Sequence, residues 1–167
     1  MRTSVVIPVY NGARTVQRAL DSIFAQTRLP EEVIVVDDGS TDGTREVLGS
    51  FGDHVRVLHQ SNRGLPAARN AGVGASTGDL IAFLDADDRW LPRKLEKQIA
   101  CFEQSPQAGL VHCGYLDITP HMRPLRAVID GASGWVATEM INYSSHVILG
   151  GGSAMVVSRR AFDAVGG

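Results

Sequence analysis

The clearest pattern in the chain is an alternation between short apolar runs and segments in which apolar residues recur every three or four positions. Short runs rich in Val and Ile are typical of strands that are buried on both faces of a sheet. The predicted strands are Ser4–Val9, Val33–Val36, Val55–Leu58 and Leu80–Leu84. Apolar residues at helical spacing, such as Val16, Leu20 and Ile23, indicate amphipathic helices between them. The predicted helices are Ala13–Gln26, a helix around Val47 and Leu48, Leu65–Ala75 and a helix bearing Leu95, Ile99 and Phe102.

Local signals mark the ends of these helices. One of the three polar residues 40–42 is predicted to cap the helix around Val47, because Ser, Thr and Asp side chains accept hydrogen bonds from free helix amides. Pro92 is predicted to lie in the first turn of the helix that bears Leu95, Ile99 and Phe102, where its missing N–H costs little. The glycines from Gly72 to Gly78 indicate that the Leu65–Ala75 helix frays at its end.

The periodicity weakens in the last third of the chain. Leu110–Tyr115 is predicted as a fifth strand, and the Pro-, Gly- and polar-rich segment Ile118–Gly134 as a long loop or lid. Ser153–Ser158 reads as another strand and Arg159–Val165 as the start of a short helix.

Strands that alternate with helices predict an α/β fold. We therefore expect a Rossmann-like, mostly parallel sheet flanked by helices, and the 167 residues are enough for one domain with its own core. In such sheets, ligands bind outside the carboxyl ends of the strands.

Composition then narrows the classes of partner. The net charge is −2 and no basic stripe is present, which argues against a nucleic-acid partner. No apolar stretch approaches the ~20 residues that a membrane helix needs, so no transmembrane segment is expected. The apolar part of the N-terminus is too short for a signal peptide. These features together predict a cytoplasmic location.

The acidic segment Asp85-Ala86-Asp87-Asp88 directly follows the predicted strand Leu80–Leu84. Carboxylates this close repel one another and are costly to desolvate, unless a cation lies between them. In an extended segment, the side chains of Asp85 and Asp87 point to the same side. Oxygen ligands suit a hard divalent ion, so the segment predicts a site for a metal that carries a diphosphate.

A second acidic pair, Asp37-Asp38, follows the strand Val33–Val36. The turn after it could simply cap a helix. It also partly matches a calcium loop, but Gly49 stands where that loop needs a bidentate Glu. We favour a third interpretation, in which Asp38 accepts hydrogen bonds from a nucleotide base or ribose.

The third strand is followed by a segment that mixes small residues with Arg63, Arg69 and Asn70. Arg69 could offer its guanidinium to a phosphate, or it could lie on a solvated helix face. The first strand-to-helix turn, Pro8–Arg14, lacks the Gly-x-Gly-x-x-Gly pattern of dinucleotide-binding domains. A dehydrogenase is therefore not expected.

With these motifs in view, the chain resembles the inverting family 2 glycosyltransferases of the GT-A fold. The motifs occur in the order and spacing of that family, from Ser4 to about Lys94, with weaker similarity to Gly167. The segments that carry the resemblance are Ser4–Asn11, Val36–Thr44, Asn62–Leu65, Ala68–Gly72, Gly78–Asp79 and Leu84–Asp88.

The resemblance implies a UDP-, GDP- or dTDP-sugar as donor. By motif position, Pro8 and Tyr10 would line the nucleoside pocket and Asp38 would contact the base. Arg69 would lie near the nucleotide, and Asp85 near the ribose or the sugar.

The resemblance also implies a bound Mn²⁺ or Mg²⁺, which Asp87, the last acid of the Asp-x-Asp motif, would coordinate. Residues 1–117 would form the nucleotide-sugar-binding part and residues 118–167 an incomplete acceptor-side part of a single domain. The acceptor would be a glycan, a lipid-linked molecule or a small molecule. The family resemblance also implies a role in polysaccharide synthesis, and the cytoplasmic location could include the inner face of the membrane.

Family members usually carry the catalytic base in a segment that follows a Gly-Gly pair like Gly166-Gly167. We therefore expect the catalytic base to lie beyond Gly167. Within this chain, no catalytic residue is assigned. Four other acids lack the expected context: Asp117, Asp130, Glu139 and Asp163.

Two alternatives stay open at this point. The first is a non-catalytic module that holds a sugar nucleotide. The second is a sugar nucleotidyltransferase, which would normally show a Gly-rich, basic phosphate loop after the first strand, and the segment Asn11–Arg14 is a poor version of such a loop.

Overall fold

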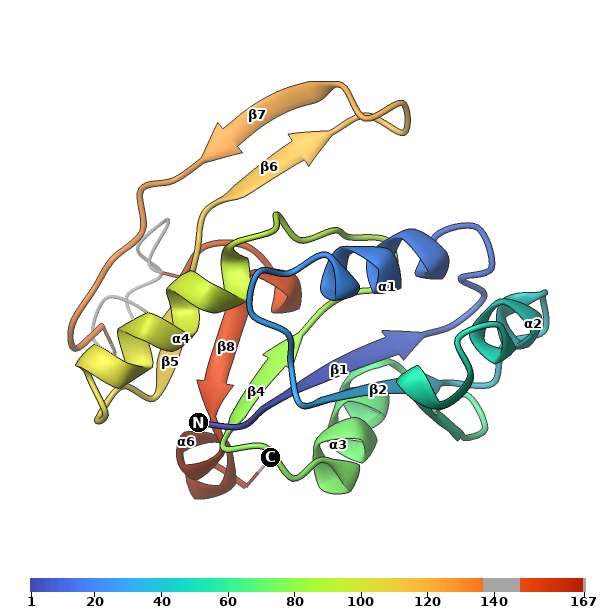
Figure 1. Cartoon of the computed structure of the whole chain (residues 1–167), viewed down its shortest axis with the longest axis horizontal. Coiled ribbons are helices and arrows are strands. Elements are labelled where there is room, and N and C mark those ends of the chain that lie inside the picture. The colour runs from blue at the N-terminus through green and yellow to red at the C-terminus, as the bar shows by residue number, and fades with distance from the viewer. Residues whose placement is uncertain (137–147, 167) are drawn as a thin grey trace.

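A twisted six-stranded sheet forms the centre of the molecule, with helices on both faces (Figure 1). The computed structural model describes residues 1–136 and 148–166. The strand order is β3-β2-β1-β4-β8-β5, and β8 runs antiparallel to both of its neighbours. The strands of this sheet are β1 (Thr3–Val9), β2 (Glu32–Asp37), β3 (Arg56–His59), β4 (Leu80–Phe83), β5 (Leu110–His112) and β8 (Met155–Ser158). The expectation of an α/β fold with a mostly parallel sheet is confirmed.

The helices divide between the two faces according to the alternation of side chains along the strands. The helices are α1 (Val16–Phe24), α2 (Thr44–Gly49), α3 (Leu65–Ala75), α4 (Lys94–Gln104) and α6 (Arg159–Ala164). Val5 and Ile7 of β1 share one core with α1, α2 and α4. Val6, which points to the opposite face, packs with Val73 of α3 and Phe162 of α6. Both faces of β1 are therefore fully covered, which explains its uninterrupted apolar run.

Gly72 lies inside α3 at its closest approach to the sheet, not in a frayed helix end as predicted. A Cβ added at Gly72 would lie 2.3 Å from Cγ1 of Val6 and 3.1 Å from Cγ2 of Val36. The glycine therefore lets the helix backbone rest directly on β1 and β2.

We expect Gly72→Ala to destabilise the protein by about 1–3 kcal/mol, because the core has no room for another methyl group. Gly74→Ala is the matched control on the same helix, since its Cβ would meet no atom within 4 Å. That change should stabilise by about 0.4–1 kcal/mol by restricting the unfolded chain. Urea unfolding measures both, and two substitutions of equal effect would contradict this account of the packing.

Pro8 lies just beyond the point where β1 and β4 stop pairing. The carbonyl of Val9 accepts from Asp38 on the β2 side, whereas the carbonyl of Val6 accepts from Leu84 on the β4 side. Pro8 therefore faces the β4 side, where pairing ends with Val6 opposite Phe83. Its missing N–H thus costs no ladder hydrogen bond. Since the chain crosses from β1 to β2 on one side and β4 lies on the other, this gap is the switch point where such sheets bind ligands.

The predicted loop or lid at 118–134 is wrong in part, because residues 124–128 form one strand of a two-stranded hairpin. Its strands are β6 (Tyr115–Ile118) and β7 (Pro124–Val128), and the hairpin stands apart from the main sheet (Figure 1). The predicted fifth strand accordingly stops at His112, and Tyr115 begins β6. No residue of the two strands is buried, and four of the five residues of β7 are exposed, so no buried alternation marks the hairpin in the sequence.

The structure also corrects two helix starts. The N-cap of α2 is Gly43, which has no side chain, while Asp42 accepts from the amide of Thr44 at 3.1 Å. Pro92 precedes α4 instead of lying in its first turn, because Arg93 is the N-cap and has a non-helical backbone. Within residues 1–136 and 148–166, no helix has the length and apolar character to cross a membrane.

Candidate functional site

The polar segments that follow β1, β2 and β4 lie along one edge of the sheet, where these three strands end. Pro8 is buried inside β1, and Tyr10, just beyond the strand, is 53% exposed. Asp38 directly follows the end of β2, and Asp85 lies two residues after the end of β4. The site therefore lies at the switch point beside β1.

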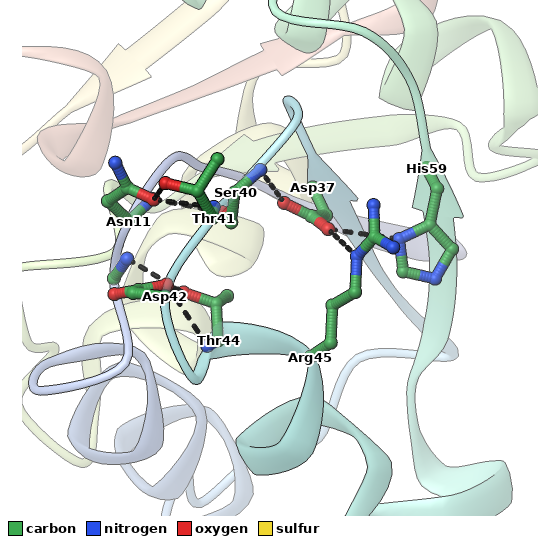
Figure 2. A network of polar contacts seen from close by, with 9 residues as sticks. Asn11, Asp37, Ser40, Thr41, Asp42, Thr44, Arg45 and His59 are labelled. Atoms are coloured by element: carbon green, nitrogen blue, oxygen red, sulfur yellow. Dashed lines mark hydrogen bonds and ion pairs between the residues drawn. The ribbon is translucent and has the colours of Figure 1, made fainter.

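The first turn after β1 is bound to the turn after β2. Asn11 has a left-handed backbone (φ 53°), and its Oδ1 accepts from the amide of Thr41 at 2.8 Å (Figure 2). The amides of residues 11–13 all donate to side chains of the second turn. Their acceptors are Ser40 Oγ at 2.9 Å, Thr44 Oγ1 at 2.9 Å and Asp42 Oδ2 at 3.1 Å. These are the amides that would cradle a pyrophosphate in a dinucleotide-binding domain, and here the protein itself uses them.

Asp37 is the fully buried centre of a polar network (Figure 2). Its Oδ1 accepts from the amide of Ser40 at 2.9 Å, and its Oδ2 lies 3.0 Å from both Arg45 Nε and His59 Nδ1. Burial by itself would raise the pKa of Asp37, but the hydrogen bonds from Ser40, Arg45 and His59 outweigh it and lower the pKa to about 2. The carboxylate thus joins β2, α2 and β3 beneath the site.

Asp38 organises the segment that follows β3. Its Oδ1 accepts from Gln60 Nε2 at 2.6 Å and from the amide of Arg63 at 2.9 Å, and its Oδ2 accepts from the amide of Gly64 at 2.8 Å. Burial would raise its pKa, but these hydrogen bonds and the charge of Arg63 lower it. Asp38 therefore has structural partners that the sequence did not reveal, and a contact with a base would use its remaining lone pairs.

The residue after Asp38 must be small for this arrangement to form. Gly39 has φ 80°, and a Cβ there would lie 2.8 Å from the backbone nitrogen of Asn62. The turn after β2 and the segment after β3 thus pack backbone against backbone.

Arg69 and Asp85 are brought together as an ion pair. Arg69 Nη2 donates to Asp85 Oδ1 at 2.7 Å, and both side chains are about a quarter exposed. The guanidinium also lies 5.7 Å from the ring centre of Phe83. Arg69 is therefore not on a solvated helix face, which was the alternative interpretation of its position.

Asp87 and Asp88, the remaining acids of the segment, keep much of their surface exposed to solvent, but Asp88 is also partly covered by protein. Partial burial raises the pKa of Asp88, and the charges of Asp87 and Asp85 raise it further, against a hydrogen bond from Ser153. The carboxylates therefore do repel one another, as the sequence predicted. Across residues 1–136 and 148–166, no three His, Cys, Asp or Glu side chains are grouped to hold a metal by themselves. A cation here would need further ligands from a diphosphate or from water.

Sequence reasoning assigned no definite role to two residues of this site, Gly152 and Ser153. They lie in the 3₁₀ turn Gly152–Ala154 that precedes β8. Ser153 Oγ accepts from the amide of Asp85 at 2.9 Å, and Gly152 lies against the guanidinium of Arg69. The run of glycines before Ser153 was visible in the sequence, but nothing in it indicated these partners. Among the acids that were considered as a base, Asp117 pairs with Arg126 on the hairpin.

Residues 4–166 match the description "Glycosyl transferase family 2". The chain belongs to this family. An uncharacterised glycosyltransferase of Nostoc sp. is 43% identical over 122 residues, covering 71% of this chain and 37% of the relative. The uncharacterised glycosyltransferase YibD of Escherichia coli is 40% identical over 98 residues, covering 57% of this chain and 28% of the relative. The chain thus spans less than two fifths of the length of these relatives.

Solved structures of glycosyltransferases have the same fold. TarS 1-349 of S. aureus in complex with UDP-GlcNAc has a TM-score of 0.61 and 27% identity, over 72% of this chain and 36% of that one. The mannosyltransferase PcManGT of Pyrobaculum calidifontis in complex with GDP-Man and Mn²⁺ has a TM-score of 0.73 and 24% identity. It covers 99% of this chain and 47% of its own, and at this identity it supports the fold alone. The expected GT-A fold and the family resemblance are confirmed. The catalytic base expected beyond Gly167, like Glu139, lies outside the described residues.

Proposed function

We propose that this family 2 domain binds a nucleotide-diphosphate sugar and serves in its transfer, with inversion and with a divalent metal, to an acceptor hydroxyl. The observation that carries the proposal is the acidic segment, with Arg69 bound to Asp85, at the switch point beside β1. The amides of the first turn are used internally, so a diphosphate has to be held elsewhere. The acidic segment with a cation offers that place.

Within this proposal, the nucleoside lies over the ends of β1 and β2. Tyr10 is exposed and would cover the base or ribose. Pro8 would line the bottom of the nucleoside pocket, where β1 and β4 no longer pair. Asp38 faces the same edge and would contact the base. Residues 1–117 form the donor-binding part and 118–167 the acceptor-side part, although β8 from the second part pairs with β4 in the same sheet.

The residues present fit a hard divalent cation, because the segment offers carboxylate oxygens whose charges repel one another. Asp87 would hold Mn²⁺ or Mg²⁺, with diphosphate oxygens completing the ligand set, and Asp85 would lie near the ribose or sugar. A bound ion of this kind supplies Lewis-acid stabilisation to the departing diphosphate. Arg69 adds a fixed positive charge on the same side, held in orientation by Asp85 and by the ring of Phe83.

The donor is proposed to be a UDP-, GDP- or dTDP-sugar. TarS, which is 27% identical over the matched part, has been solved with UDP-GlcNAc, and this favours UDP as the first donor to test. The acceptor is proposed to be a glycan, a lipid-linked molecule or a small molecule. A role in polysaccharide synthesis and a cytoplasmic place at the inner face of the membrane are also proposals.

Two other functions are weighed against this one. Membership of the glycosyltransferase family argues against a sugar nucleotidyltransferase. A non-catalytic sugar-nucleotide-binding module uses the same donor site, and it differs only in lacking a general base for the acceptor hydroxyl. Transfer assays with UDP-sugar and candidate acceptors separate a transferase from such a module.

The donor site is tested by thermal unfolding of the chain with UDP, GDP or dTDP, each with Mn²⁺ and with EDTA. A nucleotide at a hundred times its Kd stabilises by about 2.7 kcal/mol, which raises the Tm of a domain this size by roughly 5–10 °C. We expect one nucleotide to do so with Mn²⁺ and to lose the effect with EDTA. The absence of any nucleotide-dependent change in Tm would contradict the proposed function.

A further inference from the structure

We infer that Gly152 and Ser153 are positioning residues that set the orientation of Arg69 and Asp85 for the donor diphosphate. This inference rests on the proposed function and deepens it, because it assigns a role in the donor site to the turn before β8. Three contacts carry it: the hydrogen bond that the Ser153 hydroxyl accepts, the one that its carbonyl accepts, and the close approach of the Arg69 guanidinium to Gly152.

The hydroxyl of Ser153 replaces sheet pairing where β4 leaves the sheet. The last ladder-type hydrogen bond of β4 runs from the amide of Leu84 to the carbonyl of Val6. One residue further on, the amide of Asp85 has no neighbouring strand to bond with, and it donates to Ser153 Oγ at 2.9 Å instead. The backbone of Asp85 is thereby fixed at the point where the crevice opens.

The carbonyl of Ser153 holds the other end of the acidic segment. The buried indole of Trp90 donates from Nε1 to this carbonyl at 2.8 Å, and the Trp90 amide donates to Ser22 Oγ at 3.1 Å. Residues 85–90 are therefore held at both ends by a single residue of the turn before β8. The exposed Asp87 lies between these two points, so its place depends on both.

Gly152 sets the position of the guanidinium. A Cβ at Gly152 would lie 2.4 Å from Nη2 and 2.9 Å from Cζ of Arg69. The same guanidinium has the ring of Phe83 5.7 Å away and donates from Nη2 to Asp85. Any side chain at Gly152 would push Arg69 out of this arrangement and would break its bond with Asp85.

The two variants Ser153→Ala and Gly152→Ala test the inference in a Trp135→Phe background. The chain has two Trp residues, and Trp135 is 86% exposed, so this background leaves Trp90 as the fluorescent reporter of the acidic segment. The probes are UDP and GDP, each titrated with Mn²⁺. Ser50→Ala and Gly74→Ala serve as matched controls, because Ser50 bonds locally to the carbonyl of Val47 and Gly74 has open space around it.

We expect Ser153→Ala to raise the Kd of the nucleotide about 5- to 10-fold, which corresponds to one hydrogen bond. Ser153→Thr keeps the hydroxyl and should restore binding. Gly152→Ala should raise the Kd roughly 10-fold or more, but it should have little further effect in an Arg69→Ala background, because both changes act on the same guanidinium. Neither control should change the Kd.

Amide hydrogen exchange, measured by NMR without any ligand, separates this inference from the proposed function. In Ser153→Ala the amide of Asp85 should lose protection, while that of Leu84 should keep it. The positioning role would be overturned if the Asp85 amide kept its protection in Ser153→Ala. It would also be overturned if Gly152→Ala raised the Kd by the same factor in the presence of Arg69 and in the Arg69→Ala background. The exchange could change as expected while the unmodified chain binds no nucleotide with Mn²⁺. The positioning contacts would then stand, but the proposed function and the role of these contacts in binding a diphosphate would be overturned.

Discussion

Replacing Asp87 with Ala is expected to abolish metal-dependent nucleotide binding, with a loss of at least about 100-fold in affinity. A divalent ion that is held by one or two carboxylates and a diphosphate cannot lose a carboxylate without losing most of its hold on the protein. The repulsion that raises the pKa of Asp88 would also fall, so the fold itself should keep its stability. The effect is therefore expected on binding and not on the unfolding of the free chain.

Calorimetric titration of UDP or GDP with Mn²⁺ measures this effect, and EDTA should reproduce it in the unmodified chain. Asp53→Ala is a suitable control, because Asp53 is an exposed acid in the 3₁₀ helix Gly52–His54, which precedes β3 and so lies away from the carboxyl edge. An Asp87→Ala chain that binds the nucleotide as tightly with Mn²⁺ as the unmodified chain would rule out the role proposed for Asp87.

Replacing Asp37 with Asn should lower the free energy of unfolding at pH 7 by roughly 1.5–3 kcal/mol, the range for hydrogen bonds to charged groups. The buried carboxylate accepts from the Ser40 amide, Arg45 and His59. The Asn side chain has the same shape and keeps one acceptor oxygen. Its NH₂ group replaces the other oxygen and would face donors that it cannot accept from. The strands β2 and β3 and the helix α2 would then lose their shared anchor (Figure 2).

The pH dependence has a definite sign. The pKa of Asp37 is lowered from 3.8 to about 2 in the folded protein, so its contribution is complete above the ordinary value and is lost as the pH falls toward about 2. The difference in stability between the unmodified chain and Asp37→Asn should therefore shrink between pH 4 and pH 2. Urea unfolding at pH 7, 5, 4 and 3 measures it, with Glu46→Gln on α2 as control. A difference that does not change with pH would show that the charge of Asp37 is not what stabilises the fold.

Elements whose apolar face is buried could be predicted closely from the sequence. Leu65–Ala75 was predicted with the bounds that α3 has, and the cores of β1, β2 and β4 were placed correctly. In each case the hydrophobic period records which side of the element lies against the core. The hairpin β6–β7 was missed for the converse reason. Leu116 and Leu125 are 49% and 68% exposed, so apolar residues there do not mark a buried face.

The helix starts and Gly72 failed for a different reason. Gly72 reads locally as a helix-ending residue, yet its position is decided by Val6, which lies on β1 far away in the chain. Likewise, Asp42 was a reasonable cap, but its second oxygen accepts from the amide of Ala13 in another turn. Local propensity is a weak guide wherever a contact between distant segments competes with it.

The α/β class, the covered strands, and the family with its acidic and basic residues at the strand ends could all be inferred from the order of the amino acids. That order could not determine which of those polar groups the protein uses for itself. That was decided by the tertiary structure, which assigned Asp37 and Asp38 to internal partners and placed Ser153 on the Asp85 amide across 68 positions. The physical reason is that a buried polar group must find a partner, and the order of strands in the sheet, not proximity in the chain, decides which group is within reach.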